Sequence, residues 1–188
     1  MVPMSLTKEQ QSQLLGIARQ SIQHGFTTGS ALAINAADYP GIMSEPRATF
    51  VTLELDRQLR GCIGILEAIR PLVVDVAENA FAAAFRDPRF PPLTQQEYVG
   101  IELHISMLTP PELMSIRSEQ DLLAQLRPNI DGLILEDGRH RATFLPSVWE
   151  SIPSPLQFVQ HLKQKAGLPV AYWSDSIKAY RYTAEYIG

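Results

Sequence analysis

The sequence is poor in cysteine and has no excess of basic residues. Its 188 residues include one cysteine, Cys62, so no intramolecular disulfide can form. Sixteen basic and twenty acidic residues give a net charge of -4. Nucleic-acid-binding proteins usually carry a basic stripe that neutralises phosphates, and the densest basic stretch here is only Arg139 to Arg141. We therefore predict no nucleic-acid partner.

Long apolar runs are also absent. The apolar stretches are far shorter than the roughly 18 residues that a membrane span requires. The N-terminal stretch MVPMSLTKEQQSQLLG lacks the charged region followed by an apolar region that marks a secretory signal. We predict no membrane partner and a cytoplasmic location.

Motifs that bind metals or nucleotides are missing as well. Neither C-x-x-C nor H-E-x-x-H occurs, and the four histidines (His24, His104, His140 and His161) are scattered. The sequence contains neither G-x-G-x-x-G nor a P-loop pattern. The sequence therefore predicts no metal site and no cofactor.

The periodicity of apolar residues predicts a mixture of helices and hairpins. A capping box at Thr7 and Gln10 begins a helix that we expect to end at His24-Gly25. The predicted helices cover about 7–23, 71–86, 118–126 and 155–166. The predicted strands cover about 31–35, 49–55, 59–66, 101–107, 132–136, 141–145 and 177–187.

This order of elements predicts an α+β fold with a largely antiparallel sheet and flanking helices. The first hairpin turns at residues 56–58, and the second turns at Asp137-Gly138, a favoured turn pair. We treat residues 1–188 as one domain. Glycines and prolines between residues 87 and 132 predict a smaller lobe within about 87–131.

The segment LRGCIG, residues 59–64, is the most distinctive chemically. Strict strand alternation would place Arg60, Cys62 and Gly64 on one face and the apolar residues of the segment on the core face. Arg60 and Cys62 would then lie about 6.6 Å apart at their backbones. A guanidinium that close favours the thiolate form of a cysteine, so Cys62 and Arg60 are candidate catalytic residues.

The same segment has a simpler interpretation. A lone cysteine often behaves as a small buried hydrophobe. Gly61 and Gly64 are candidate ligand-binding positions because they leave space beside Cys62, but glycine also permits close internal packing. The sequence leaves both interpretations open.

Two other places carry candidate side chains. Arg86, Asp87 and Arg89 lie in a proline-rich loop that either faces a ligand or forms a packed turn. His104 lies on the polar face of a predicted strand. If that strand neighbours the Cys62 strand, His104 becomes the base of a cysteine–histidine pair; otherwise it is polar surface.

At these residues the sequence resembles the AMMECR domain family, which is named after the human Alport syndrome, midface hypoplasia and elliptocytosis chromosomal region. The matching segments keep the family's order and cover nearly the whole chain. They are FVTL (50–53), LRGCIG (59–64), DPRFPPLT (87–94), ISMLTPPE (105–112), GLIL (132–135), FLPSVWE (144–150) and FVQHLKQKAGL (158–168).

The resemblance implies a two-lobed α+β fold with the LRGCIG motif near a cleft. It implies an enzyme, or an enzyme component, that acts on a small molecule with a radical SAM enzyme and a Memo-like protein. Such proteins resemble protein A of the bacterial and archaeal AmmeMemoRadiSam system. The alternative is a non-catalytic binding or scaffold module. Arg60, Gly61, Cys62 and Gly64 match the family motif, whereas the family residue at position 104 is variable and often acidic.

Overall fold

The computed structural model describes residues 5–188 and confirms the predicted α+β class. The chain divides into two compact units, each built on a four-stranded sheet. Unit 1 comprises residues up to Thr109 together with Glu185–Gly188, and unit 2 comprises Pro110–Ala184. The N-terminal stretch that we predicted not to be a secretory signal begins with residues 1–4, which lie outside the described residues.

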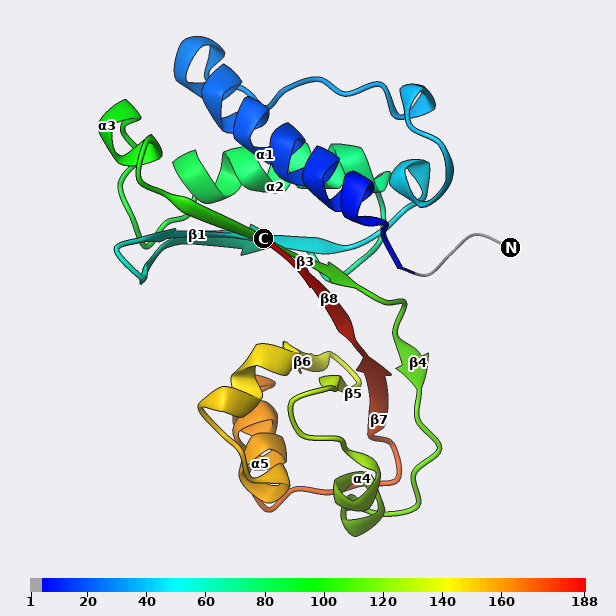
Figure 1. The fold of residues 1–188 in the computed structure, drawn as a ribbon. Helices are drawn as coiled ribbons and strands as arrows, with labels where there is room; N and C mark the ends of the chain where they lie inside the picture. The colour runs from blue at the N-terminus through cyan, green and yellow to red at the C-terminus, as the bar shows by residue number, and fades with distance from the viewer. Residues whose placement is uncertain (1–4) are drawn as a thin grey trace. The chain divides into compact units, whose positions relative to one another are not determined.

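Unit 1 is a sheet with helices on one face (Figure 1). Its strand order is β2-β1-β3-β8, and β1 pairs antiparallel with both β2 and β3. The two long helices pack on each other, and α2 also packs on β1 and β2. The elements are α1 (Lys8–Thr28), β1 (Thr49–Leu55), β2 (Gln58–Gly64), α2 (Leu72–Phe85), α3 (Gln95–Tyr98), β3 (Glu102–Leu108) and β8 (Ala184–Ile187).

Helix α1 begins as predicted and ends later than predicted. The Thr7–Gln10 capping box forms, but the helix continues past His24 and ends at Gly29, whose φ of 70° is left-handed. Gly25 is buried inside the helix, where a Cβ atom would collide with the rings of Phe81 and Phe85. The glycine predicted to end the helix therefore serves close packing between α1 and α2.

The first hairpin forms as predicted. Asp56 and Arg57 make a two-residue turn with φ values of 52° and 64°, both left-handed, as a tight hairpin requires. The strand predicted at residues 31–35 does not form. That segment is loop, followed by the short 3-10 helices η1 (Ala36–Asp38) and η2 (Gly41–Ser44).

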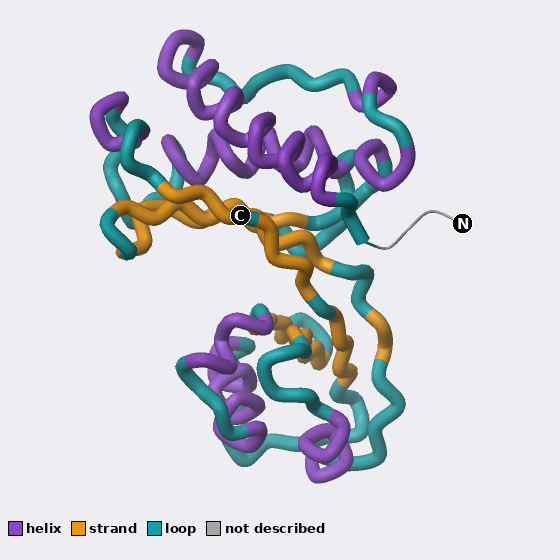
Figure 2. The backbone as a smooth tube through the Cα atoms, viewed as in Figure 1, coloured by secondary structure: helices purple, strands orange, loops and turns teal. Residues whose placement is uncertain are grey.

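Unit 2 contains the second sheet, of order β4-β7-β5-β6, and its own apolar core around Trp149 and Phe158. The predicted hairpin around Asp137-Gly138 forms between β5 and β6. Figure 2 shows the helices and strands of each unit. The elements are β4 (Glu112–Leu113), α4 (Glu119–Gln125), β5 (Gly132–Asp137), β6 (His140–Phe144), η3 (Pro146–Glu150), α5 (Pro155–Lys165) and β7 (Lys178–Tyr182).

The last strand and the smaller lobe also differ from the prediction. The strand expected at 177–187 is interrupted at Thr183, so β7 joins the second sheet and β8 joins the first. The smaller lobe expected within 87–131 differs from unit 2, which begins at Pro110. The earlier prolines lie in a loop that packs within unit 1, where Leu93 donates a hydrogen bond to Ala84.

Within residues 5–188, no helix is both long enough and apolar enough to cross a membrane.

Candidate functional site

The candidate site begins with an irregularity in β2. Leu53 lies opposite Gly61, but its neighbour Glu54 lies opposite Leu59, so Arg60 has no cross-strand partner. This is a β-bulge, and a bulge redirects the side chains around it. Leu59 shares the face of Glu54 rather than the core face. The predicted alternation is therefore wrong at Leu59 and Arg60, because it assumed a regular strand.

Because of the bulge, the side chains of Arg60 and Cys62 have different surroundings. The Arg60 side chain donates from Nε and Nη2 to the Glu97 carboxylate, at 2.9 and 3.1 Å, and from Nη2 to the Pro91 carbonyl at 2.9 Å. Arg60 is 8% exposed. The hydrogen bonds from Arg60 lower the pKa of Glu97 to about 2. Arg60 therefore ties the 91–97 segment to the sheet and has its carboxylate partner there, away from the thiol.

Cys62 lies as the sequence predicts. Ile63 packs on the core of unit 1, and Cys62 points to the opposite face, half-buried. Its cross-strand partner there is Thr52. The Cys62 Sγ and the Thr52 Oγ1 are 3.2 Å apart, so a thiol and a hydroxyl meet on the face that points away from α1 and α2.

The backbone of Cys62 is held by Asp87 and Arg89. β2 is an edge strand, so one side of its backbone has no strand to pair with. The Cys62 N–H donates to Asp87 Oδ2 at 2.9 Å, and Arg89 Nη2 donates to the Cys62 carbonyl at 3.3 Å. Arg89 also binds the Asp87 carboxylate with Nε and Nη2, at 3.0 and 2.7 Å. The two loop residues thus replace a neighbouring strand at this position.

The hydrogen bonds to Asp87 have an electrostatic consequence. The hydrogen bond from Arg89 holds the pKa of Asp87 well below its usual range, although burial opposes the shift. The same pair raises the pKa of Arg89. Arg89 is 54% exposed, so its charge also reaches solvent beside Cys62. Arg86 lies apart from this group, with its guanidinium over the ring of Phe81 at 5.0 Å.

Both glycines of LRGCIG are close-packing positions. A Cβ atom at Gly61 would overlap the carbonyl oxygen of Ala83 in α2. A Cβ atom at Gly64 would overlap the Phe50 ring and the Thr49 carbonyl. The space that these glycines leave is therefore filled from within unit 1.

His104 does not meet Cys62. The strand order places β1 between β2 and β3, so the two residues are two strands, or about 10 Å, apart. Thr52 lies opposite both of them. The cysteine–histidine pair was expected only if the two strands were neighbours, and that condition is not met. His104 Nε2 lies instead 3.7 Å from Glu54 and 4.0 Å from Glu102.

No pattern in the sequence indicates these two glutamates or the residues of a pocket in unit 2. Glu54 and Glu102 are distant in sequence, and only the pairing of β1 with β3 brings them together.

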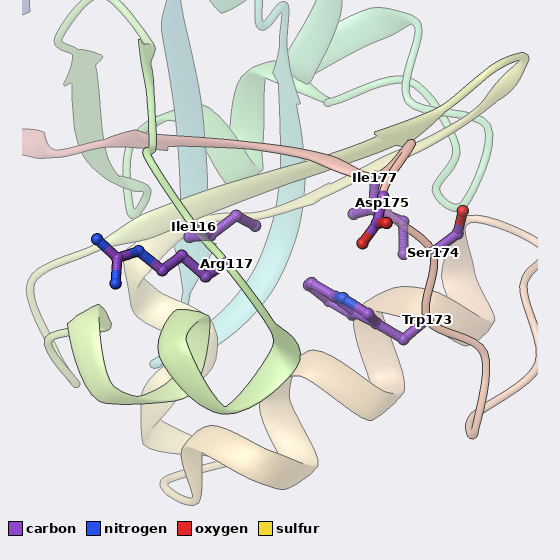
Figure 3. Close-up of a pocket in the computed structure, with 6 residues that line it drawn as sticks. All are labelled: Ile116, Arg117, Trp173, Ser174, Asp175 and Ile177. Carbon is purple, nitrogen blue, oxygen red and sulfur yellow. The ribbon is translucent and has the colours of Figure 1, made fainter.

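The pocket in unit 2 has a volume of about 240 Å³. In Figure 3 the Trp173 ring faces Asp175 and Ile116, while the Arg117 guanidinium points away from them. Its lining is Ile116, Arg117, Trp173, Ser174, Asp175 and Ile177.

We expect Asp87→Asn to lower the free energy of unfolding by about 1–2 kcal/mol at pH 7, because it removes a charged acceptor of four hydrogen bonds. The depressed pKa of Asp87 means that its contribution is present above about pH 3.8 and is lost as the pH falls below that value. The difference between wild type and variant in urea unfolding should therefore shrink below pH 3.8. Asp38→Asn, at an exposed position, is the control; a pH-independent difference for Asp87→Asn contradicts the electrostatic argument.

Comparisons with known proteins agree with this architecture. A family model described as AMMECR1 matches residues 15–187. Protein MJ0810 of Methanocaldococcus jannaschii is 38% identical, in a match that covers 96% of this chain and 90% of that protein. A protein of Methanothermobacter thermautotrophicus is 35% identical, in a match that covers 96% of this chain and 94% of that protein.

A solved structure extends the match to three dimensions. The crystal structure of the uncharacterized protein PH0010 from Pyrococcus horikoshii is similar with a TM-score of 0.85 and 32% sequence identity. The match covers 96% of this chain and 92% of that chain. The chain belongs to the AMMECR1 family.

Proposed function

We propose that this chain is an enzyme, or a component of one, that acts on a small molecule at Cys62. The observation that supports the proposal is the meeting of the Cys62 thiol and the Thr52 hydroxyl at 3.2 Å on a half-buried strand face. A thiolate is a strong nucleophile, and a neighbouring hydroxyl can donate a hydrogen bond to it.

Arg89 is the cation of this site. Its guanidinium reaches the Cys62 carbonyl and remains half exposed, whereas Arg60 is enclosed by Glu97 and Pro91. A half-exposed guanidinium can still bind a carboxylate or phosphate of a substrate. In this proposal Arg89 orients an anionic group, Asp87 fixes Arg89, and Arg60 supports the loop that carries them.

The resemblance to the AMMECR domain family supports the second part of the proposal. In bacteria and archaea such proteins are associated with a radical SAM enzyme and a Memo-like protein. We propose that the chain works in one reaction sequence with these two partners.

Metabolite profiling tests both parts. Cells that lack the protein should accumulate a small molecule, and cells that lack the radical SAM partner should show a change in the same sequence of compounds. Wild-type protein and Gln58→Ala, an exposed change in the same strand, should restore the normal profile. Cys62→Ala should fail to restore it while folding normally by circular dichroism.

A binding or scaffold module is the second candidate. It is favoured by the internal packing of Gly61 and Gly64 and by the hydrogen bonds that hold the Cys62 backbone. Under this function, LRGCIG is a structural or partner-docking edge strand. Full rescue by Cys62→Ala would reject the enzymatic proposal and leave this one.

A further inference from the structure

Three side chains that could bind a metal, two glutamates and one histidine, meet on the face of the unit 1 sheet that also carries Cys62. Glu54 comes from β1, and Glu102 and His104 come from β3. One ligand atom from each lies within 4.8 Å of the other two. The set combines one imidazole nitrogen with carboxylate oxygens from two strands.

The distances suit a shared ion better than direct contact. His104 Nε2 is 3.7 Å from Glu54 Oε2 and 4.0 Å from Glu102 Oε2. Hydrogen bonds between such atoms are about 2.7–3.2 Å long, so both separations are too great. Two ligands bound to one zinc ion, each about 2.0–2.2 Å from it, lie roughly 3–4 Å apart. The two separations from His104 therefore match those of ligands of a common cation, and the third pair lies within 4.8 Å.

The strand pairing also places like charges together. Glu54 and Glu102 lie directly opposite each other on β1 and β3. Like charges directly opposite each other destabilise a sheet. A bound cation would convert this repulsion into attraction for both carboxylates.

A cavity opens beside the cluster. Its volume is about 360 Å³, and Glu102 and His104 line it together with Arg19 of α1. A metal ion with three protein ligands has further coordination positions, which require space for water or an added ligand. Arg19 supplies a positive charge on the wall of that space.

From these observations we propose that Glu54, Glu102 and His104 bind one divalent transition-metal ion, such as zinc or manganese, beside the cavity that Glu102 and His104 line. The imidazole favours these metals over magnesium and calcium, which prefer oxygen ligands alone. The site is separate from Cys62, because Thr52 of β1 lies between His104 and Cys62. It does not depend on the function proposed for Cys62.

Titration calorimetry with zinc chloride tests the proposal on the full chain after treatment with a chelator. Wild-type protein should bind one zinc ion per chain. Glu102→Gln and His104→Asn should each weaken binding by more than about tenfold. Cys62→Ala and His161→Asn, which alter a thiol and an exposed histidine outside the cluster, should bind zinc as the wild type does.

Thermal unfolding separates metal binding from a structural role. Glu102 is 66% exposed, and its replacement removes a repulsion, so metal-free Glu102→Gln should unfold at or above the wild-type temperature. At the same zinc concentration, the unfolding temperature of the wild type should rise more than that of Glu102→Gln. The proposal is overturned if wild-type protein binds no zinc at about 1 mM, if binding survives both variants, or if Cys62→Ala abolishes it.

Discussion

Gly61→Ala should lower the free energy of unfolding by about 3 kcal/mol, because the added methyl group would overlap the Ala83 carbonyl oxygen. That oxygen belongs to the backbone of α2, so it cannot move away as the end of a flexible side chain would. Relief requires α2 to shift from β2, which would disturb the core that both elements share. Far-ultraviolet circular dichroism in urea follows the helices and strands of both units, so the part of the transition that tryptophan fluorescence does not follow measures the effect on unit 1. Both tryptophans, Trp149 and Trp173, belong to unit 2 and report on that unit.

Gly16→Ala is the matched control. Gly16 lies within helix α1. Apart from its chain neighbours and the nearby backbone of its own helix, no atom of the described residues lies within 4 Å of an added Cβ. Alanine is favoured over glycine inside a helix by about 0.5–1 kcal/mol, so this variant should be more stable than the wild type. Equal stability of Gly61→Ala and wild type would show that the close approach of α2 to β2 is not required.

Local pattern was sufficient for the hairpins and for the orientation of Cys62. The alternation of Val51 and Leu53 predicts β1, and the same alternation places Ile63 towards the core and Cys62 away from it. These features depend on side-chain direction along one strand, which a sequence carries directly. They are also the features that the structure confirms.

The surroundings of Cys62 depend on contacts between distant segments. The bulge at Arg60 is defined by its register against β1, and the carboxylate that binds the Arg60 side chain, that of Glu97, lies 37 positions further along the chain. Gly25 and Gly61 look like a helix end and a ligand position until α2 is packed against them. A single sequence gives no register between strands and no distance between a helix and a sheet. The bulge and the close-packing role of the two glycines are therefore evident only in the three-dimensional structure.

The cluster of Glu54, Glu102 and His104 was beyond sequence analysis for a related reason. Glu102 and His104 are two positions apart on one strand, a spacing too common to indicate a metal site. Glu54 joins them only because β1 pairs with β3 in a register that places it opposite Glu102. Metal motifs are recognisable in sequence when the ligands share one local element, and here they come from two strands.

Glu97→Gln should lower the free energy of unfolding by about 2–3 kcal/mol at pH 7, because it leaves the buried Arg60 charge without its carboxylate. The effect is smaller than for a fully buried ion pair because the Glu97 side chain is 29% exposed and water screens the charges. Within the described residues, Arg60 Nη1 already lacks a hydrogen-bond partner, so only the Pro91 carbonyl would remain besides the new amide. Glutamine preserves the capping box with Thr94, which isolates the loss of charge from the loss of the helix cap.

The pH dependence of this effect has a definite sign. Arg60 depresses the pKa of Glu97 from 4.5 to about 2 in the folded protein. The stability that the carboxylate contributes is therefore fully present above about pH 4.5 and is lost as the pH falls towards 2. Urea unfolding of wild type and Glu97→Gln should differ most at neutral pH and converge over that interval. Glu78→Gln, on an exposed position of α2, should change stability by less than about 0.5 kcal/mol. A Glu97→Gln variant as stable as Glu78→Gln would mean that Arg60 is not held by its ion pair.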